Sequence, residues 1–216
     1  MLENAEKEIV GKINDFLLPC QQPETIGLYF GSFNPIHNGH LKLAKYITAN
    51  RIADEVWFVV SPCNPLKQQD ELLDETLRME MVKLATETED TLKVCDVELS
   101  LPTPSYTIDT LNVLKKQYPN NNFVLLIGSD NALAFDRWKN YKEILNEYKI
   151  MVYPRLNYDF AEILQKFPQM QILDTPFYDI SASKIREKIK KQDLEITKQW
   201  LQEPVSAFIE ENKLYQ

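Results

Sequence analysis

Short apolar runs alternate with segments of helical periodicity along most of the chain. Residues 25–30 and 56–60 are apolar runs of strand length, and residues 41–49 between them have helical spacing. Residues 123–127 are so uniformly apolar that we expect a strand buried on both faces, followed after Gly128 by a polar turn. The pattern therefore begins as a strand, helix, strand unit.

The same alternation continues toward residue 173. Helices are predicted over residues 75–87 and 106–117, and strands over residues 91–97 and 149–152. Strands separated by helices favour a parallel sheet that is covered on both faces and has right-handed connections. We therefore predict an α/β fold with a doubly wound parallel sheet.

The segments outside this alternation are predicted to be helical. Ser181 can cap a helix that runs through Lys191, and Pro204 suits the first turn of another helix. The N-terminal residues have the spacing of an amphipathic helix. We divide the chain into an N-terminal extension, a core and a helical C-terminal region, with bounds 1–24, 25–180 and 181–216.

Composition narrows the class of protein. A chain of 216 residues with 44% hydrophobic residues can bury a substantial core, and it has neither a run long enough for a membrane helix nor a secretory pattern. A net charge of -8 argues against broad binding to nucleic-acid phosphates. The three cysteines form no ligand pair or disulfide framework. We expect a cytoplasmic protein without membrane or nucleic-acid partners.

Two histidines, His37 and His40, are the only ones in the chain, and they lie where the first strand meets its helix. A helix N-terminus offers free N–H groups and partial positive charge, so two imidazoles there suit an anion such as phosphate. Gly31 allows a positive φ or a close backbone approach, Pro35 shapes the turn, and we expect Gly39 to keep bulk away from the ligand.

The histidine pair is also compatible with two simpler roles. One histidine can cap the helix while the other packs in the core. Two histidines on one face can also bind zinc, but the spacing suggests no third ligand, and the HExxH arrangement is missing. The chain has neither a Walker loop nor a GxGxxG fingerprint, so a nucleotide must be held in another way.

Two sequence motifs resemble those of the HxGH nucleotidyltransferases. Residues 31–40, GSFNPIHNGH, resemble the signature G-[ST]-F-[DN]-P-x-H-x-G-H, and residues 180–186, ISASKIR, resemble the second ATP motif. The segment PSYTIDTL at 104–111, with IGSD at 127–130 and Trp138, is similar to the nicotinate-nucleotide adenylyltransferase branch. The resemblance spans residues 25–215 and implies a Rossmann-like nucleotidyltransferase fold, with the C-terminal region completing the ATP site.

Membership of this branch implies a specific reaction. The phosphate of nicotinate mononucleotide attacks the α-phosphorus of ATP in line, which gives deamido-NAD and pyrophosphate in NAD biosynthesis. No protein nucleophile is needed, so catalysis rests on positioning and charge stabilisation. Mg²⁺ is expected as the ion that ATP carries, with no dedicated carboxylate cage.

The resemblance also implies which residues form the site. His37 and His40 would donate to the ATP phosphates, and Arg186 would contact the departing pyrophosphate. The other expected ATP-binding residues are Gly31, Ser32, Phe33, Gly128, Asp130, Ile180, Ser181 and Ser183. Two of these assignments have plain alternatives, because Asp130 can cap the next helix and Arg186 can be a solvated helix charge.

The expected mononucleotide site has five members. Trp138 would stack on the pyridine ring, although a tryptophan is more often a core residue, and the Thr107 backbone N–H would lie near the ring carboxylate. Tyr106 would close the pocket, with Lys139 beside Trp138. Lys67 is the candidate for the mononucleotide phosphate, although Leu66 stands where many relatives have histidine.

Several rival functions share part of this pattern. Nicotinamide mononucleotide, phosphopantetheine or a cytidylyltransferase substrate could replace the expected acceptor. Residues 104–111 and Trp138 favour the nicotinate branch. A regulatory module that binds ATP without turnover is the alternative from another class, and it is disfavoured because both histidines and Arg186 are present. A homo-oligomer is compatible with the sequence.

Overall fold

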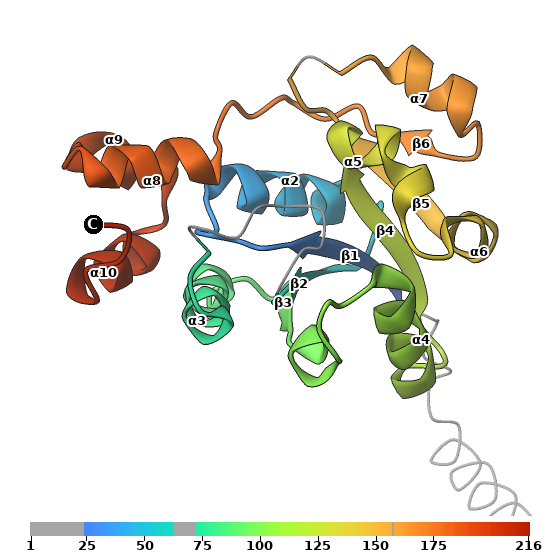
Figure 1. Cartoon of the computed structure of the whole chain (residues 1–216), viewed down its shortest axis with the longest axis horizontal. Coiled ribbons are helices and arrows are strands. Elements are labelled where there is room, and N and C mark those ends of the chain that lie inside the picture. Colours follow the sequence, from blue (N-terminus) through green and yellow to red (C-terminus); the bar gives the residue numbers. More distant parts are fainter. Residues whose placement is uncertain (1–23, 63–71, 157) are drawn as a thin grey trace, which may run out of the picture.

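A six-stranded parallel sheet forms the centre of the protein. The computed structural model describes residues 24–62, 72–156 and 158–216. The strand order is β3-β2-β1-β4-β5-β6, and every neighbouring pair is parallel, which confirms the doubly wound α/β prediction (Figure 1). The strands are β1 (Thr25–Gly31), β2 (Glu55–Val60), β3 (Leu92–Cys95), β4 (Asn122–Gly128), β5 (Lys149–Tyr153) and β6 (Gln171–Ile172).

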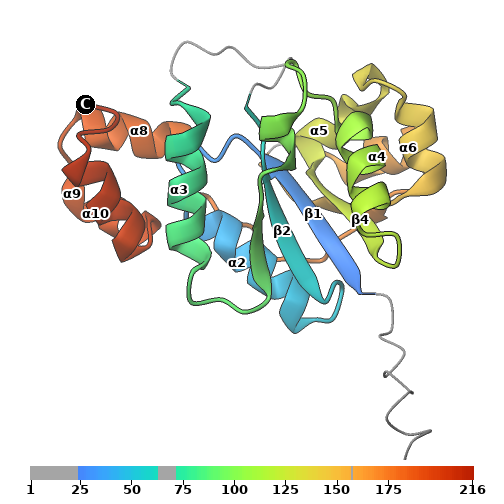
Figure 2. The same cartoon turned by 90° about the horizontal axis from the view of Figure 1, so that it is seen from below.

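Helices cover both faces of this sheet (Figure 2). One buried cluster joins the sheet to α2, α3, α8 and α10, and a second joins it to α4, α5, α6 and α7. The helices are α2 (Asn38–Ala49), α3 (Glu75–Thr86), α4 (Thr107–Gln117), α5 (Ser129–Leu133), α6 (Tyr141–Glu147), α7 (Phe160–Lys166), α8 (Ala182–Lys190), α9 (Leu194–Trp200) and α10 (Glu203–Glu211), with short 3-10 helices η1 (Val97–Ser100) and η2 (Phe135–Arg137).

The central strands explain why the sheet appears in the sequence as a series of apolar runs. In β4, Phe123 and Leu125 belong to one buried cluster, whereas Val124 and Leu126 belong to the other. Neighbouring residues of a strand point to opposite faces, so a strand covered on both sides needs apolar residues throughout. The expectation that residues 123–127 are buried on both faces is confirmed.

Some local predictions need correction. The strand expected over 91–97 ends at Cys95, where its pairing with β2 also ends, and η1 begins at Val97. The polar turn expected after Gly128 is wrong because Ser129 begins α5. Ser129 is fully buried and its hydroxyl accepts a hydrogen bond from the Arg155 backbone N–H at 2.9 Å, so this segment is anchored to the sheet.

The C-terminal helices lie together at one end of the molecule (Figures 1 and 2). Ser181 caps α8 by accepting a hydrogen bond from the Lys184 N–H at 3.2 Å, and α10 has proline in its first turn, as predicted. The α10 helix packs against α3. The amphipathic helix expected for the N-terminal extension lies outside the described residues, except for Glu24.

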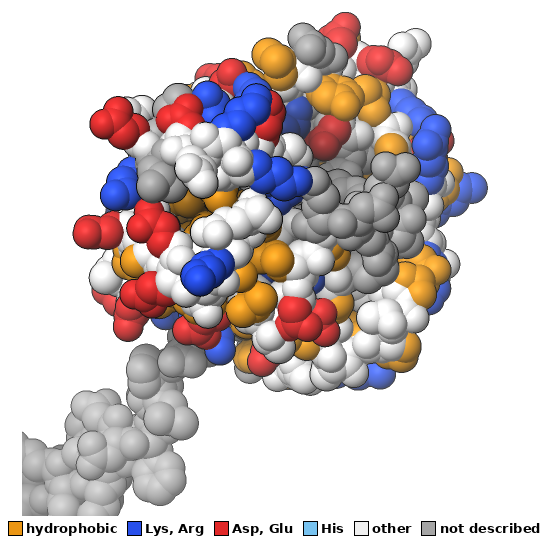
Figure 3. Space-filling model, turned by 60° about the vertical axis from the view of Figure 1, so that its left-hand side comes forward, with side chains coloured by type: hydrophobic (Ala, Val, Ile, Leu, Met, Phe, Trp, Pro, Cys, Tyr) orange, Lys and Arg blue, Asp and Glu red, His pale blue; other side chains and the backbone are white. Residues whose placement is uncertain are grey.

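Two general features bear on possible partners. Within the described part of the chain, no helix combines the length and apolar character needed to cross a bilayer. Acidic and basic side chains are interspersed on the face drawn in Figure 3.

Candidate active site

A cavity of about 500 Å³ opens at the carboxyl ends of β1, β4 and β5. Strands β1 to β3 are added in order on one side of the sheet, and strands β4 to β6 on the other side. The strand order therefore reverses between β1 and β4. Ligands of open α/β sheets bind outside the carboxyl ends at such a switch point. The cavity also lies within the size range of small-molecule sites.

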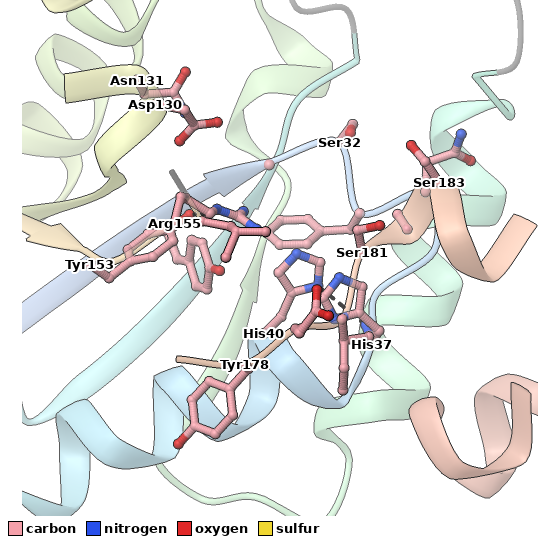
Figure 4. Close-up of a pocket in the computed structure, with 18 of the residues that line it drawn as sticks. Ser32, His37, His40, Asp130, Asn131, Tyr153, Arg155, Tyr178, Ser181 and Ser183 are labelled. Carbon is pink, nitrogen blue, oxygen red and sulfur yellow. Dashed lines mark hydrogen bonds between the residues drawn. The ribbon is translucent and has the colours of Figure 1, made fainter. Parts of the chain in front are cut away.

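The predicted ATP-binding residues largely share this cavity (Figure 4). The first motif contributes residues from the end of β1 and the start of α2, and the second contributes the start of α8. The predicted residues that line the cavity are Gly31, Ser32, Phe33, His37, His40, Asp130, Ile180, Ser181, Ser183 and Arg186. Gly128 is not among the lining residues but adjoins the Asp130 side chain, because a Cβ added to Gly128 would clash with Asp130 Oδ1.

The two histidine rings stack on one another at the start of α2. Their centroids are 3.6 Å apart with an interplanar angle of 20°, and the His37 backbone N–H donates to His40 Nδ1 at 3.2 Å (Figure 4). Since His40 Nδ1 accepts this bond, the proton of the neutral ring sits on Nε2. Edge contacts with Phe33 and Tyr29, at 5.2 and 5.7 Å between centroids, further orient the His40 ring.

His37 is electrically neutral at physiological pH. Its side chain is only 3% exposed. Burial, followed by the positive charge of Arg155, lowers the pKa of His37 from 6.5 to about 3. Among the described residues, His37 Nδ1 has no hydrogen-bond partner. A buried polar atom without a partner is costly, so this position suits a ligand atom.

The turn between β1 and α2 is unusual at Phe33. Phe33 has φ of 45°, the left-handed region that non-glycine residues seldom adopt. Its ring folds under Gly31, where an added Cβ would lie 2.8 Å from a ring carbon. Gly31 itself has no positive φ, so the close approach is the reason for glycine there. An added Cβ at Gly39 would lie 3.0 Å from His37 Nδ1, so Gly39 leaves room for the His37 ring and not only for a ligand.

A buried arginine, Arg78 of α3, supports this turn from behind. Its side chain is fully buried and its guanidinium donates to the carbonyl of Ser32 at 2.7 Å. It also donates to the carbonyls of Ser61, Pro62 and Leu73, at 2.8, 3.0 and 2.8 Å. Arg78 therefore ties together the segments that follow β1 and β2. Sequence reasoning missed it because an arginine on a helix normally indicates a solvated face.

Arg186 connects the second motif to the first. Its Nη1 donates to the backbone carbonyl of Asn34 at 3.0 Å, although the two residues are 152 positions apart. Arg186 also lines the cavity, so it is not a solvated helix charge. On the other side of the turn, Asn38 of α2 donates to the carbonyl of Gln199 at 2.9 Å and accepts from Gln202 at 2.6 Å. The C-terminal helices thus hold both ends of the turn.

A second cationic group, Arg155, faces the histidines from the end of β5 (Figure 4). Its guanidinium lies 5.3 Å from the Tyr153 ring centroid, and its Nε is buried without a partner among the described residues. Asp130 Oδ1 is buried and unpartnered in the same way. Sequence reasoning did not select Arg155. The available signal was its position just after an apolar strand, at the edge of the sheet where ligands bind.

The predicted mononucleotide residues are not among those that line this cavity. Tyr106 occupies the N-cap position of α4, and Thr107 is the first residue of that helix. Lys139 pairs with Asp109 at 2.8 Å and lies 4.7 Å from the Tyr106 ring centroid. Trp138 packs at 4.9 Å from Phe135, and its Nε1 is buried without a partner among the described residues. The structure therefore brings Tyr106 and Lys139 together. Lys67 lies outside the described residues.

A buried carboxylate underlies the Tyr106 region. Glu98 of η1 is 2% exposed and accepts hydrogen bonds from the hydroxyls of Ser105 and Thr110, both at 2.8 Å. These two residues flank Tyr106 and Thr107. Glu98 thus fixes the start of α4 from inside the protein, and no sequence motif pointed to it.

Comparison with known proteins places this geometry in a family. Residues 28–188 match the sequence profile of the Cytidylyltransferase-like family. The chain is 44% identical over 167 residues to the "Probable nicotinate-nucleotide adenylyltransferase" of Flavobacterium johnsoniae, which covers 77% of this chain and 86% of the relative. It is 47% identical over 163 residues to the protein of the same name from Bacteroides fragilis, covering 76% of this chain and 81% of the relative.

A solved structure shares the fold. The chain superimposes on Plasmodium falciparum nicotinic acid mononucleotide adenylyltransferase complexed with NaAD with a TM-score of 0.75, at 23% identity, over 89% of this chain and 97% of the other. By the extent of the profile match and the identity to its bacterial relatives, the chain belongs to the nicotinate-nucleotide adenylyltransferase family of the cytidylyltransferase-like nucleotidyltransferases.

Proposed function

We propose that the protein transfers the adenylyl group of ATP to nicotinate mononucleotide in NAD biosynthesis. An oxygen of the mononucleotide phosphate bonds to the α-phosphorus of ATP as the bond from that phosphorus to the β-phosphate oxygen breaks. Pyrophosphate leaves with the bonding electron pair, and deamido-NAD is formed. The observation that carries this proposal is that the motifs at 31–40 and 180–186 line one cavity.

The histidine pair is suited to bind the triphosphate as neutral donors. His40 holds its proton on Nε2, because Nδ1 accepts the His37 backbone N–H. His37 remains uncharged because its pKa is lowered to about 3. A preorganised donor at a site of developing charge typically contributes about 2.7 to 4 kcal/mol. We assign this role chiefly to His40, with His37 fixing the position of its ring.

Positive charge for the leaving pyrophosphate comes from two sides of the cavity. Arg186 lies in the N-terminal half of α8, and Arg155 follows the carboxyl end of β5. The free N–H groups of α8 add partial positive charge near Ser181 and Ser183. Because the charge on the leaving group grows in the transition state, these groups lower the barrier more than they strengthen ground-state binding. The C-terminal region, 181–216, thereby completes the ATP site.

The acceptor is assigned to the patch formed by the start of α4 and the segment around Trp138. Thr107 is the first residue of α4, so its backbone N–H has no partner within the helix and suits the nicotinate carboxylate. Tyr106 and Lys139 lie beside it. Trp138 offers an indole face for the pyridine ring and an Nε1–H without a partner among the described residues. Lys67 stays a prediction for the acceptor phosphate.

Mg²⁺ is proposed as an ion that arrives with ATP. Within the described residues, no group of three histidine, cysteine or acidic side chains could hold a metal by itself. Asp130 nevertheless presents a buried Oδ1 without a partner in the cavity, and Mg²⁺ often takes one carboxylate together with substrate phosphates and water. The residues present therefore fit such an ion, which when bound would neutralise part of the triphosphate charge.

The choice of acceptor is tested by pyrophosphate release. ATP is supplied with nicotinate mononucleotide, nicotinamide mononucleotide or phosphopantetheine, and release is followed with a coupled pyrophosphatase assay. We expect the highest kcat/KM with nicotinate mononucleotide. Turnover only with phosphopantetheine would overturn the acceptor assignment, and binding of ATP without turnover of any acceptor would favour a regulatory module. A cytoplasmic location stays a prediction.

A further inference from the structure

The segment that follows α10 contacts the loop of the first motif, which is the turn between β1 and α2 at residues 32–37. Tyr215 is 9% exposed, and its hydroxyl donates a hydrogen bond to Oδ1 of Asn34 at 2.8 Å. Asn34 is itself 4% exposed and lines the cavity. A tyrosine 181 positions away in the chain therefore holds a side chain of the proposed ATP loop.

This hydroxyl lies close to two arginines that donate hydrogen bonds to the backbone of the same loop. Arg78 donates to the carbonyl of Ser32, and Arg186 donates to the carbonyl of Asn34. Both positive charges act on the Tyr215 phenol, but burial has the larger effect and raises the pKa of Tyr215. The phenol therefore keeps its proton and stays a donor to Asn34.

The loop needs restraint from outside because its backbone is strained. Phe33, between Ser32 and Asn34, is held at φ of 45°. Such conformations persist only where the surrounding structure fixes them. The side chain of Asn34 is held by the Tyr215 hydroxyl and by a longer bond from the Leu73 N–H at 3.4 Å. Of these two, the Tyr215 bond is the shorter and comes from the C-terminal region.

We propose that Tyr215 is a positioning residue for ATP, which fixes the Asn34 carboxamide and with it the backbone that presents His37 and contacts Arg186. This inference rests on the proposed function. The residue acts through Asn34 and contacts no reacting atom. Small displacements of positioning groups can cost large factors in rate, so loss of one hydroxyl has a measurable effect on ATP use.

The test compares Tyr215→Phe with a control of similar stability loss. Tyr215→Phe keeps the ring and removes the hydroxyl, while Ile163→Val in α7 trims the fully buried side chain of a helix that packs on the other sheet face. We expect Tyr215→Phe to lower kcat/KM for ATP about 10-fold and to leave KM for nicotinate mononucleotide within about twofold. Ile163→Val is expected to lower the melting temperature about as much as Tyr215→Phe does, but to leave kcat/KM for ATP and KM for nicotinate mononucleotide unchanged.

Two results would overturn the inference while leaving the proposed function intact. One is a Tyr215→Phe enzyme whose kcat/KM for ATP stays within about twofold of the active wild type. The other is a rise in KM for nicotinate mononucleotide as large as the fall in kcat/KM for ATP. If the wild type turns over no acceptor, the proposed function fails. The positioning effect is then still tested by calorimetry, which compares the affinities of the wild type and Tyr215→Phe for a non-hydrolysable α,β-methylene analogue of ATP.

A double-mutant cycle tests the route through Asn34. If the hydroxyl acts through this carboxamide, Tyr215→Phe changes the affinity for the ATP analogue less than twofold in an Asn34→Ala background, but about 10-fold in the wild type. Equal effects in both backgrounds would contradict the proposed route.

Discussion

The buried His37 makes the stability of the protein sensitive to mild acid. In the folded protein the pKa of His37 is lowered from 6.5 to about 3, first by burial and then by the charge of Arg155. Between these two values the unfolded chain binds a proton that the folded protein excludes. The free energy of unfolding therefore falls as pH decreases from about 6.5 toward about 3.

The size of this effect follows from the shift. One proton excluded over one pH unit costs about 1.36 kcal/mol, so the His37 contribution between pH 7 and pH 5 is a loss of about 2 kcal/mol. Carboxylates also titrate as the pH falls, and a His37→Gln variant retains them. The difference between the two proteins therefore isolates the imidazole.

Urea denaturation at pH 7, 6 and 5 measures this difference. We expect the free energy of unfolding of the wild type to fall by about 2 kcal/mol more than that of His37→Gln, with about 0.7 kcal/mol of the difference already present at pH 6. The absolute stabilities can differ between the proteins without affecting this comparison. Equal falls in both would refute the assignment of His37 as a buried neutral base.

Two further predictions concern side chains that no motif identified. Arg155→Met should lower kcat by about 10²-fold at saturating ATP, because a preorganised cation at the cavity is lost. The exposed Arg51→Met serves as its control, and equal activity of the two variants would exclude the role of Arg155. Glu98→Gln should raise KM for nicotinate mononucleotide while leaving KM for ATP unchanged, since Glu98 fixes the start of α4 through Ser105 and Thr110. Steady-state kinetics with each substrate varied in turn checks this, and an equal rise in both KM values would count against it.

Much of the fold could be predicted because the relevant signals are local. A strand buried on both faces must be apolar throughout, which marked β1, β2, β4 and β5 within a residue or two of their bounds. Ser181 indicated the start of α8 because an N-cap is specified by a single side chain. The histidine pair could be placed at a helix start because it lies where an apolar run gives way to helical spacing. The full role of Gly39 could not be predicted, because Gly39 accommodates the His37 ring and this contact depends on side-chain packing.

The remaining features depend on contacts between distant segments. Arg155 lines the same cavity as the histidines only because the carboxyl ends of β1 and β5 border that cavity. Arg78 and Glu98 look like surface charges in the sequence but are buried by networks of carbonyls and hydroxyls. The bond from Tyr215 to Asn34 spans almost the whole described chain. Hydrophobic period and capping signals contain no information about such pairings.

The most direct test of the central claim follows the oxygen atoms of the reaction. Nicotinate mononucleotide labelled with ¹⁸O in its phosphate is incubated with ATP and the wild-type protein, and the products are analysed by mass spectrometry. If the acceptor phosphate attacks the α-phosphorus of ATP, deamido-NAD contains all of the label and pyrophosphate contains none. Label in pyrophosphate, or no deamido-NAD at all, would contradict the proposed adenylyl transfer.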